Sequence, residues 1–157
     1  RVDATYERDG VSGITLLMTA AHSGHERVID LLLRRGAEIN LQNSKGVTAL
    51  MISAQLGHER VVHLLLRHGA EVNLQDSDGD TALTLATGYG CERVVELLLR
   101  RGAKVNLLNS NGSTALMFAA CQGHERVVDL LTRHGAEVDL QDSKGLTALM
   151  YAALLNH

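Results

Sequence analysis

Hydrophobic and polar positions follow one another in the same order five times along this chain. The segment Thr-Ala-Leu-Met stands at 48–51, 114–117 and 147–150, and close variants stand at 15–18 and 81–84, so that each begins 33 residues after the last. A fixed period of this length is typical of a solenoid, in which similar units stack on one another. It predicts one array over residues 1–157, with units at about 10–42, 43–75, 76–108 and 109–141 and a partial unit at 142–157.

Each unit contains the signals for a turn and two helices. In the second unit, Thr48 is suited to an N-cap, because its hydroxyl can accept a backbone N–H at the start of a helix that ends near Leu56. Gly57 follows, where glycine readily adopts the left-handed conformation that ends helices. A second helix over about 59–68 carries valine and leucine around more than half of its circumference, so it must bury several sides. One unit alone cannot bury these surfaces, whereas stacked units can.

The third unit departs from this pattern. Thr84 stands where the other units have methionine, Thr87 where they have alanine, Gly88 lies inside the first helix, and Cys91 replaces a histidine. Threonine and glycine lower helix propensity, glycine by about 1 kcal/mol relative to alanine. We therefore expect the helix near 81–88 to be the least stable interior helix of the array.

The two ends of the chain differ from the interior units. The pair at 2–3, Val-Asp, parallels the pair at 138–139, so we interpret residues 1–9 as the remnant of a preceding repeat, followed by a longer finger. The partial unit stops after its first helix, which indicates a segment of a longer array or an end that packs on another surface. We expect its apolar side chains to stay partly exposed and to promote fraying or self-association. They are Leu149, Tyr151, Leu154 and Leu155.

Composition and charge narrow the class of protein. Hydrophobic residues make up 45% of the chain and charged residues 21%, which suits a folded domain with a substantial core. The net charge is -3 with both signs mixed, and aromatics are 3%, which argues against binding to nucleic acid or to an anionic membrane. No apolar run approaches the roughly 20 residues that span a bilayer. Two isolated cysteines make no disulfide framework and favour a reducing intracellular compartment, such as the cytoplasm.

Candidate catalytic and metal-binding residues are better explained as parts of the repeat. His25, His58 and His124 hold one position in separate units, about one unit apart, so we interpret them as structural turn residues rather than metal ligands. The segment Asp-Ser-Asp-Gly-Asp at 76–80 has the preferences of a type I turn and lacks the glycine and glutamate spacing of a calcium loop. Cys91 and Cys121 lack the close spacing of a redox pair. No nucleophile motif or phosphate loop occurs, and we expect no catalytic residue, metal or cofactor.

The repeated sequence resembles the ankyrin repeat over nearly the whole chain. The segments Gly-x-Thr-Ala-Leu-Met, Gly-His-Glu-Arg-Val-Val and Gly-Ala-Glu-Val-Asn all fall in register with that family. The resemblance implies an all-α fold, an ankyrin-repeat helical solenoid of stacked helix-turn-helix units with β-turn fingers. The family usually has Thr-Pro-Leu-His where this chain has Thr-Ala-Leu-Met. Alanine fits the place of the proline as a strong helix former, and we expect the methionine thioether to fill the space of the histidine.

Asn40 and Asn73 lie in a context similar to that in which asparagines of this family are hydroxylated. Asn106 departs from it, because Lys104 stands in the acidic place, and the fourth unit has Asp139. We favour a structural role, in which the side chain hydrogen-bonds the backbone of the finger.

The resemblance also implies a function, that of a non-catalytic interaction module that binds a partner protein on its concave surface. Two alternatives stay open. One is a synthetic, consensus-type repeat scaffold or binder, since the units are unusually alike. The other is a regulatory ankyrin segment of a larger enzyme or channel.

In this family, partners usually bind the fingers and the outer face of the first helices, and those positions vary between the units here while the packing positions repeat. Tyr89 is the only aromatic side chain among the central positions and is the expected anchor, with Leu56 extending an apolar strip. Asp78 and Asp80 put negative charge beside it, with Lys45 on the neighbouring finger, so the expected partner offers an apolar patch beside a basic one. Carried over by register, the expected partner-binding residues are Ser44, Lys45, Val47, Gln55, Leu56, Ser77, Asp78, Asp80, Tyr89, Ser110, Asn111, Ser113, Cys121 and Gln122.

Overall fold

The structure is a computed structural model that describes residues 1–155. Within that range the chain forms a two-stranded hairpin followed by nine short helices. The elements are β1 (Thr5–Arg8), β2 (Val11–Thr15), α1 (Leu16–His22), α2 (Glu26–Arg34), α3 (Ala49–Gln55), α4 (Glu59–Arg67), α5 (Ala82–Gly88), α6 (Glu92–Arg100), α7 (Ala115–Gln122), α8 (Glu125–Arg133) and α9 (Ala148–Leu154).

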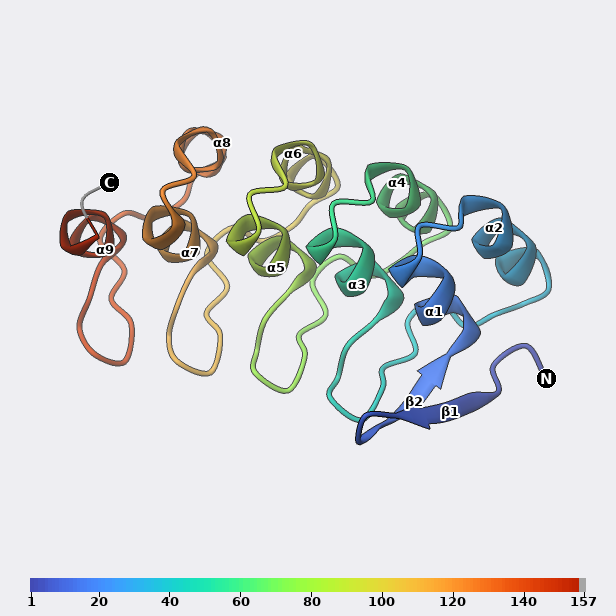
Figure 1. Cartoon of the computed structure of the whole chain (residues 1–157). Helices are drawn as coiled ribbons and strands as arrows, with labels where there is room; N and C mark the ends of the chain where they lie inside the picture. The colour runs from blue at the N-terminus through green and yellow to red at the C-terminus, as the bar shows by residue number, and fades with distance from the viewer. Residues whose placement is uncertain (156–157) are drawn as a thin grey trace.

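The helices stand in two rows. Odd-numbered helices form the first row and even-numbered helices the second. Helices pack on their neighbours in the same row, and α1 to α8 also pack in pairs across the two rows. Long loops, here called fingers, project from the first row on the side away from the second row (Figure 1). The prediction of a stacked helical solenoid is confirmed.

Each first-row helix begins at the threonine predicted to cap it. Thr48 Oγ1 accepts a hydrogen bond from Met51 N at 3.2 Å, and the threonines before the other first-row helices make the same contact. Met51 is buried, and its Sδ lies 3.5 Å from Thr48 N, so the thioether fills its space and adds a weak polar contact. Gly57 follows the helix with φ of 70°, the left-handed conformation expected at that point.

Helix α5 differs from the neighbouring first-row helices at three residues. Thr84 Oγ1 accepts a hydrogen bond from Thr81 N at 2.7 Å, which completes a reciprocal capping box with a true hydroxyl. Thr87 is fully buried, and its Oγ1 has no hydrogen-bond partner in the described part of the chain. Gly88 is the last residue of the helix and has open space where a side chain would stand. The box strengthens the start of α5 and the other two residues weaken its end, so its low stability stays a prediction.

The core lies between the two rows and depends on stacking. Interior helix α4 buries Val61, Val62, Leu65 and Leu66, whereas the terminal helix α2 buries only Ile29 from the same set of positions. Each fully buried valine or leucine contributes about 1.5–3 kcal/mol relative to exposure. Neighbouring helix pairs therefore supply burial that no single pair can reach alone.

The N-terminal finger is a β-hairpin, which the sequence reading expected only as a longer finger. β1 and β2 pair antiparallel, with Tyr6 opposite Ile14, and the turn between them is Asp9-Gly10 with φ of 53° and 76°. Positive φ at both turn residues is what a tight hairpin requires, and an Asp-Gly pair is its usual sequence signal. Before the hairpin, Asp3 Oδ1 accepts a hydrogen bond from Glu38 N at 3.0 Å.

Polar residues that recur at the same position in successive units form hydrogen bonds between neighbouring units. His58 Nε2 donates to His22 O at 3.0 Å, and His124 Nε2 makes a longer contact of 3.4 Å to Gly88 O. Asn73 Oδ1 accepts from Lys104 N at 2.8 Å, and Asn40 and Asn106 accept in the same way from the following unit. These bonds support the structural interpretation: His58 and His124 contact the preceding unit, and the asparagines bond the backbone of the following unit.

Candidate partner-binding surface

Each finger is shaped by one polar side chain at its base. Asn43 Oδ1 accepts hydrogen bonds from Lys45 N at 2.9 Å and Val47 N at 3.0 Å, which folds the tip into a tight turn. Asp76, Asn109 and Asp142 do the same in the next three fingers. Short polar residues suit this position because their side chains can reach the backbone two and four residues ahead.

The backbones of neighbouring fingers are joined into a ladder. Ser77 N donates to Lys45 O at 2.9 Å, Ser110 N to Asp78 O at 2.8 Å, and the fingers on either side continue the pattern. The contact is close because glycine precedes the last residue of each turn: a Cβ built on Gly79 would lie 2.9 Å from Asn109 Cα. The ladder fixes the finger backbones and leaves the side chains at the tips free.

The predicted partner-binding residues lie on these fingers and at the C-terminal ends of α3, α5 and α7, and none of them is buried. Those on the tips and the helix ends are mostly exposed, and those at the base are half-buried. The exposed ones are Ser44, Lys45, Leu56, Ser77, Asp78, Tyr89, Ser110, Asn111 and Gln122. The half-buried ones are Val47, Gln55, Asp80, Ser113 and Cys121.

Tyr89 stands in a prominent place among them. Its side chain is 63% exposed, and its hydroxyl accepts a hydrogen bond of 2.9 Å from Gln55 Nε2 in the preceding unit. Leu56, next to Gln55, is 44% exposed. The bond holds the Tyr89 ring in one place above the surface, so less entropy is lost when a partner covers it.

The two aspartates on the middle finger have different environments. Asp78 is exposed, whereas Asp80 is half-buried and its Oδ1 accepts a hydrogen bond of 3.1 Å from Asn109 Nδ2. Partial burial, with the nearby charges of Asp76 and Asp78, raises the pKa of Asp80 above its ordinary value. Asp78 is therefore the more effective exposed negative charge, with Lys45 exposed on the neighbouring finger.

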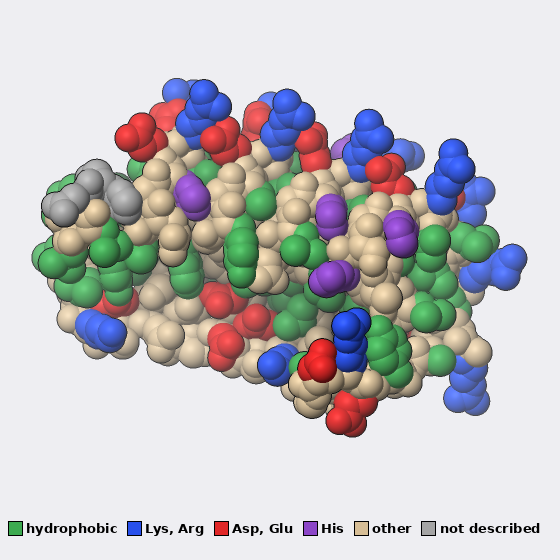
Figure 2. Space-filling view, in the orientation of Figure 1, with side chains coloured by type: hydrophobic (Ala, Val, Ile, Leu, Met, Phe, Trp, Pro, Cys, Tyr) green, Lys and Arg blue, Asp and Glu red, His purple; other side chains and the backbone are tan. Residues whose placement is uncertain are grey.

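A row of side chains between the fingers and the helix ends was not predicted from the sequence. The row is one residue past the repeated methionine position and runs through Thr19, Ile52, Leu85, Phe118 and Tyr151. The fingers reach it at both ends: Tyr6 Oη lies 2.6 Å from Thr19 Oγ1, and Tyr151 donates to Asp142 Oδ2 at 2.6 Å. Figure 2 shows hydrophobic side chains along the first-row helices with acidic side chains below them on the central fingers. The variation of this position between units was the signal that could have found it.

The hairpin adds a groove at the N-terminal end of this surface. It has a volume of about 440 Å³ and lies between the hairpin, α1 and α3, with Ile14, Val47 and Ile52 among its apolar walls. Val47 was predicted as a binding residue, but the groove could not be predicted, because one wall comes from a hairpin that the repeat pattern does not contain.

The C-terminal helix exposes the apolar side chains that were expected to be exposed. Leu149 is 76% exposed, Leu154 66% and Leu155 47%, and a largely apolar groove of about 480 Å³ lies between α7, α8 and α9. The Tyr151 hydroxyl anchors the helix on its finger and holds the pKa of Asp142 below its ordinary value, while the same bond raises the pKa of Tyr151.

Metal-ligating side chains and thiols bear on what chemistry this surface could perform. Across residues 1–155, no group of three or more histidine, cysteine, aspartate or glutamate side chains is placed to hold a metal ion. Burial raises the pKa of the Cys91 thiol, which favours the less reactive protonated form. In the same described range, no helix is both long enough and apolar enough to cross a membrane.

One comparison with known protein families bears on this arrangement. The family model described as "Ankyrin repeats (3 copies)" matches residues 17–109 and again residues 89–157. Together the two matches cover the helix pairs and four of the five fingers.

Proposed function

Because the chain belongs to the ankyrin repeat family, whose members are generally protein-interaction modules and typically non-catalytic, we propose that it binds a partner protein on its concave surface. That surface consists of the finger tips, the C-terminal ends of α3, α5 and α7, and the row from Thr19 to Tyr151. The observation that carries the proposal is the combination of a hydrogen-bonded finger backbone with exposed side chains that differ from unit to unit. A rigid frame with variable side chains reduces the entropy lost on binding and lets those side chains set specificity.

The side chains at the centre of the surface indicate the chemistry of the partner. Tyr89, Leu56 and the half-buried Leu85 offer an apolar area, and tyrosine is enriched among residues that dominate binding energy. Asp78 places negative charge beside that area. The partner in this proposal carries an apolar patch next to a basic one, and opposite charges raise the rate of association.

The proposal also covers the division of the chain into repeat units and a function that needs no catalytic residue, metal or cofactor. Residues 1–157 form a single array with units at about 10–42, 43–75, 76–108 and 109–141, preceded by the end of a repeat and followed by a partial unit. The contact of Asp3 with Glu38 N supports the assignment of residues 1–9 to a preceding repeat, because Asn40, Asn73 and Asn106 accept from the equivalent backbone N–H of the next unit. Asp3 lies 35 residues before its donor and the asparagines 31, as a longer first finger requires. The chain acts without a catalytic residue, metal or cofactor.

The test begins with affinity capture using the immobilised chain and measurement of binding to the captured protein. Tyr89→Ala should weaken binding by more than about 1 kcal/mol, and Asp78→Lys with Asp80→Lys should slow association, most strongly at low salt. Matched controls lie outside the concave surface. Leu31→Ala on α2 removes an exposed apolar side chain, and Glu125→Lys on α8 with Asp139→Lys in the loop after it makes the same charge change. If the control variants weaken binding as much as the concave ones while all remain folded, the concave assignment is wrong.

A further inference from the structure

The second-row helices carry a regular set of ion pairs on the side of the molecule away from the fingers. Between helices, Arg60 pairs with Glu26 at 3.8 Å, and the same contact recurs as Arg93–Glu59 and Arg126–Glu92 at 3.6 and 3.4 Å. Within helices, an acid pairs with the arginine four residues later. These pairs are Asp30–Arg34, Glu96–Arg100 and Asp129–Arg133.

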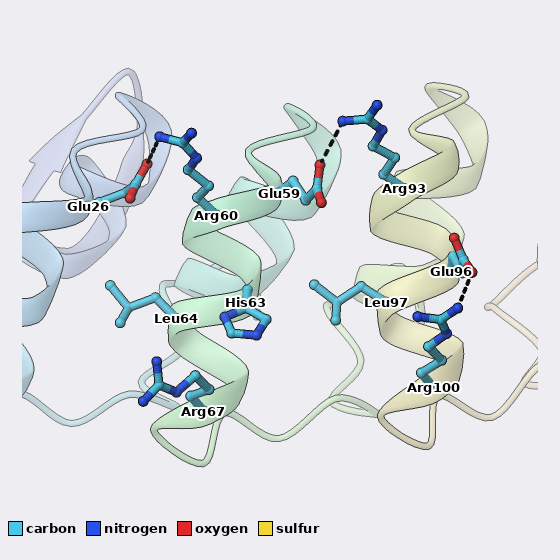
Figure 3. Close-up of a pocket in the computed structure, with 10 residues that line it drawn as sticks. All are labelled: Glu26, Glu59, Arg60, His63, Leu64, Arg67, Arg93, Glu96, Leu97 and Arg100. Atoms are coloured by element: carbon cyan, nitrogen blue, oxygen red, sulfur yellow. Dashed lines mark hydrogen bonds and ion pairs between the residues drawn. The ribbon is translucent and has the colours of Figure 1, made fainter.

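Helix α4 breaks the second series. Its arginine at this position is Arg67, but His63 stands where the other helices have aspartate or glutamate. Arg67 is exposed and has no ion-pair partner among residues 1–155, whereas Arg100 on the next helix is paired with Glu96 (Figure 3). The pattern of the other three helices thus leaves one position on α4 that lacks a carboxylate.

This position lies in a groove. The space has a volume of about 560 Å³ and is bounded by α2, α4 and α6. Leu64 and Leu97 are its half-buried apolar residues, and Figure 3 shows Leu97 pointing from α6 toward His63 on α4. The arginines of the lining outnumber the glutamates by one, and that unbalanced charge is Arg67.

We propose that this groove docks a short segment of a partner protein that carries one carboxylate beside an apolar side chain, independently of the concave surface. A carboxylate of the segment takes the place of the acid that α4 lacks and pairs with Arg67, as Glu96 pairs with Arg100. An apolar side chain next to that carboxylate covers Leu64 and Leu97. A chain with a negative charge on every unit, such as polyphosphate or polyglutamate, fits less well, because the lining also contains Glu26, Glu59 and Glu96, whose charges would repel it.

The probe is a fluorescently labelled peptide with a single glutamate flanked by leucines in an otherwise uncharged sequence, titrated with the folded chain at low salt and followed by fluorescence anisotropy. Two variants remove the site in different ways: Arg67→Gln deletes the cation, and His63→Glu supplies an internal acid that pairs with it. Each should weaken binding about five-fold, the effect of one partly exposed charge pair. A peptide with lysine in place of glutamate should not bind.

Two matched controls separate the site from general charge effects. Arg133→Gln makes the same charge change at the equivalent position of α8, outside the groove, and His63→Gln changes the histidine without adding an acid. Both should bind the probe within about two-fold of the original chain. Methyl NMR of Leu64 and Leu97 should shift on titration, and circular dichroism verifies that each variant is folded.

Three outcomes overturn the proposal. They are equal weakening by Arg67→Gln and Arg133→Gln, the absence of saturable binding at millimolar peptide, and tighter binding of a short oligonucleotide at the same methyl groups. None of these affects the concave surface, because its test uses different residues and a different readout.

Discussion

Replacement of Gly79 by alanine measures directly how tightly neighbouring fingers are packed. Gly79 has φ of +78°, and a Cβ at this position would lie 2.8 Å from Ser110 N and 2.9 Å from Asn109 Cα. Both atoms belong to the backbone of the next finger, so no side-chain rotation can relieve the contact. The fingers would have to separate, which stretches the hydrogen bond from Ser110 N to Asp78 O.

The control for this variant lies in the same unit. Gly102 has φ of +87°, and a Cβ there would meet nothing within 4 Å. Both alanines carry the cost of a left-handed conformation, about 1–2 kcal/mol. Only Gly79→Ala adds overpacking, which costs about 1–3 kcal/mol, so the two free energies of unfolding should differ by about that amount.

The assay is urea denaturation followed by circular dichroism, with amide exchange to locate the damage. Gly79→Ala should lower the midpoint more than Gly102→Ala and should increase exchange at Ser110 N, because solenoid units are coupled through nearest neighbours. Equal losses of stability in the two variants would show that the finger contact relaxes easily and that the ladder does not hold the binding surface rigid.

Four further predictions test other parts of the structure. Thr87→Ala should raise the free energy of unfolding by about 1 kcal/mol, because removal of a buried, unpaired hydroxyl outweighs a lost methyl contact, and a lower urea midpoint would contradict this. Amide exchange in α5 should be faster than in α3 and α7, and equal rates would show that the Thr81–Thr84 capping box compensates. Leu108→Gln should stabilise the chain by about 1 kcal/mol relative to Leu108→Ala, since Gln75 at the equivalent position donates to Gly79 O and Leu108 O at 2.8 and 3.0 Å. The lowered pKa of Asp142 means that its carboxylate stabilises the fold at neutral pH and loses this contribution as pH falls through that pKa. Tyr151→Phe should therefore melt earlier than the original chain at pH 7, with a difference that shrinks as pH falls below the ordinary range of aspartate; a pH-independent difference would refute this.

The sequence by itself determined the local elements. Thr48 and its counterparts begin helices and Gly57 ends one, because capping and left-handed glycine act within a single turn of backbone. The period then fixed the order of the units and the exposed positions, including Tyr89 and Asp78, since residues at the same register in similar units have similar surroundings.

Tertiary structure decided how those positions meet. The Gln55–Tyr89 bond joins residues 34 apart, and the His58 contact with His22 O joins residues 36 apart. The 33-residue period predicts only that equivalent positions recur in each unit. The distance and direction between side chains of neighbouring units depend on how closely one unit stacks on the next. The N-terminal hairpin also combines local and tertiary contributions. The pair Asp9-Gly10 is a local signal for its turn, but packing against α1 decides that the hairpin lies over Thr19 and forms one wall of the groove. The unpaired Arg67 likewise needed the structure, because a missing partner is established only when the surrounding charges have been placed in space and, within residues 1–155, none is close enough to pair with it.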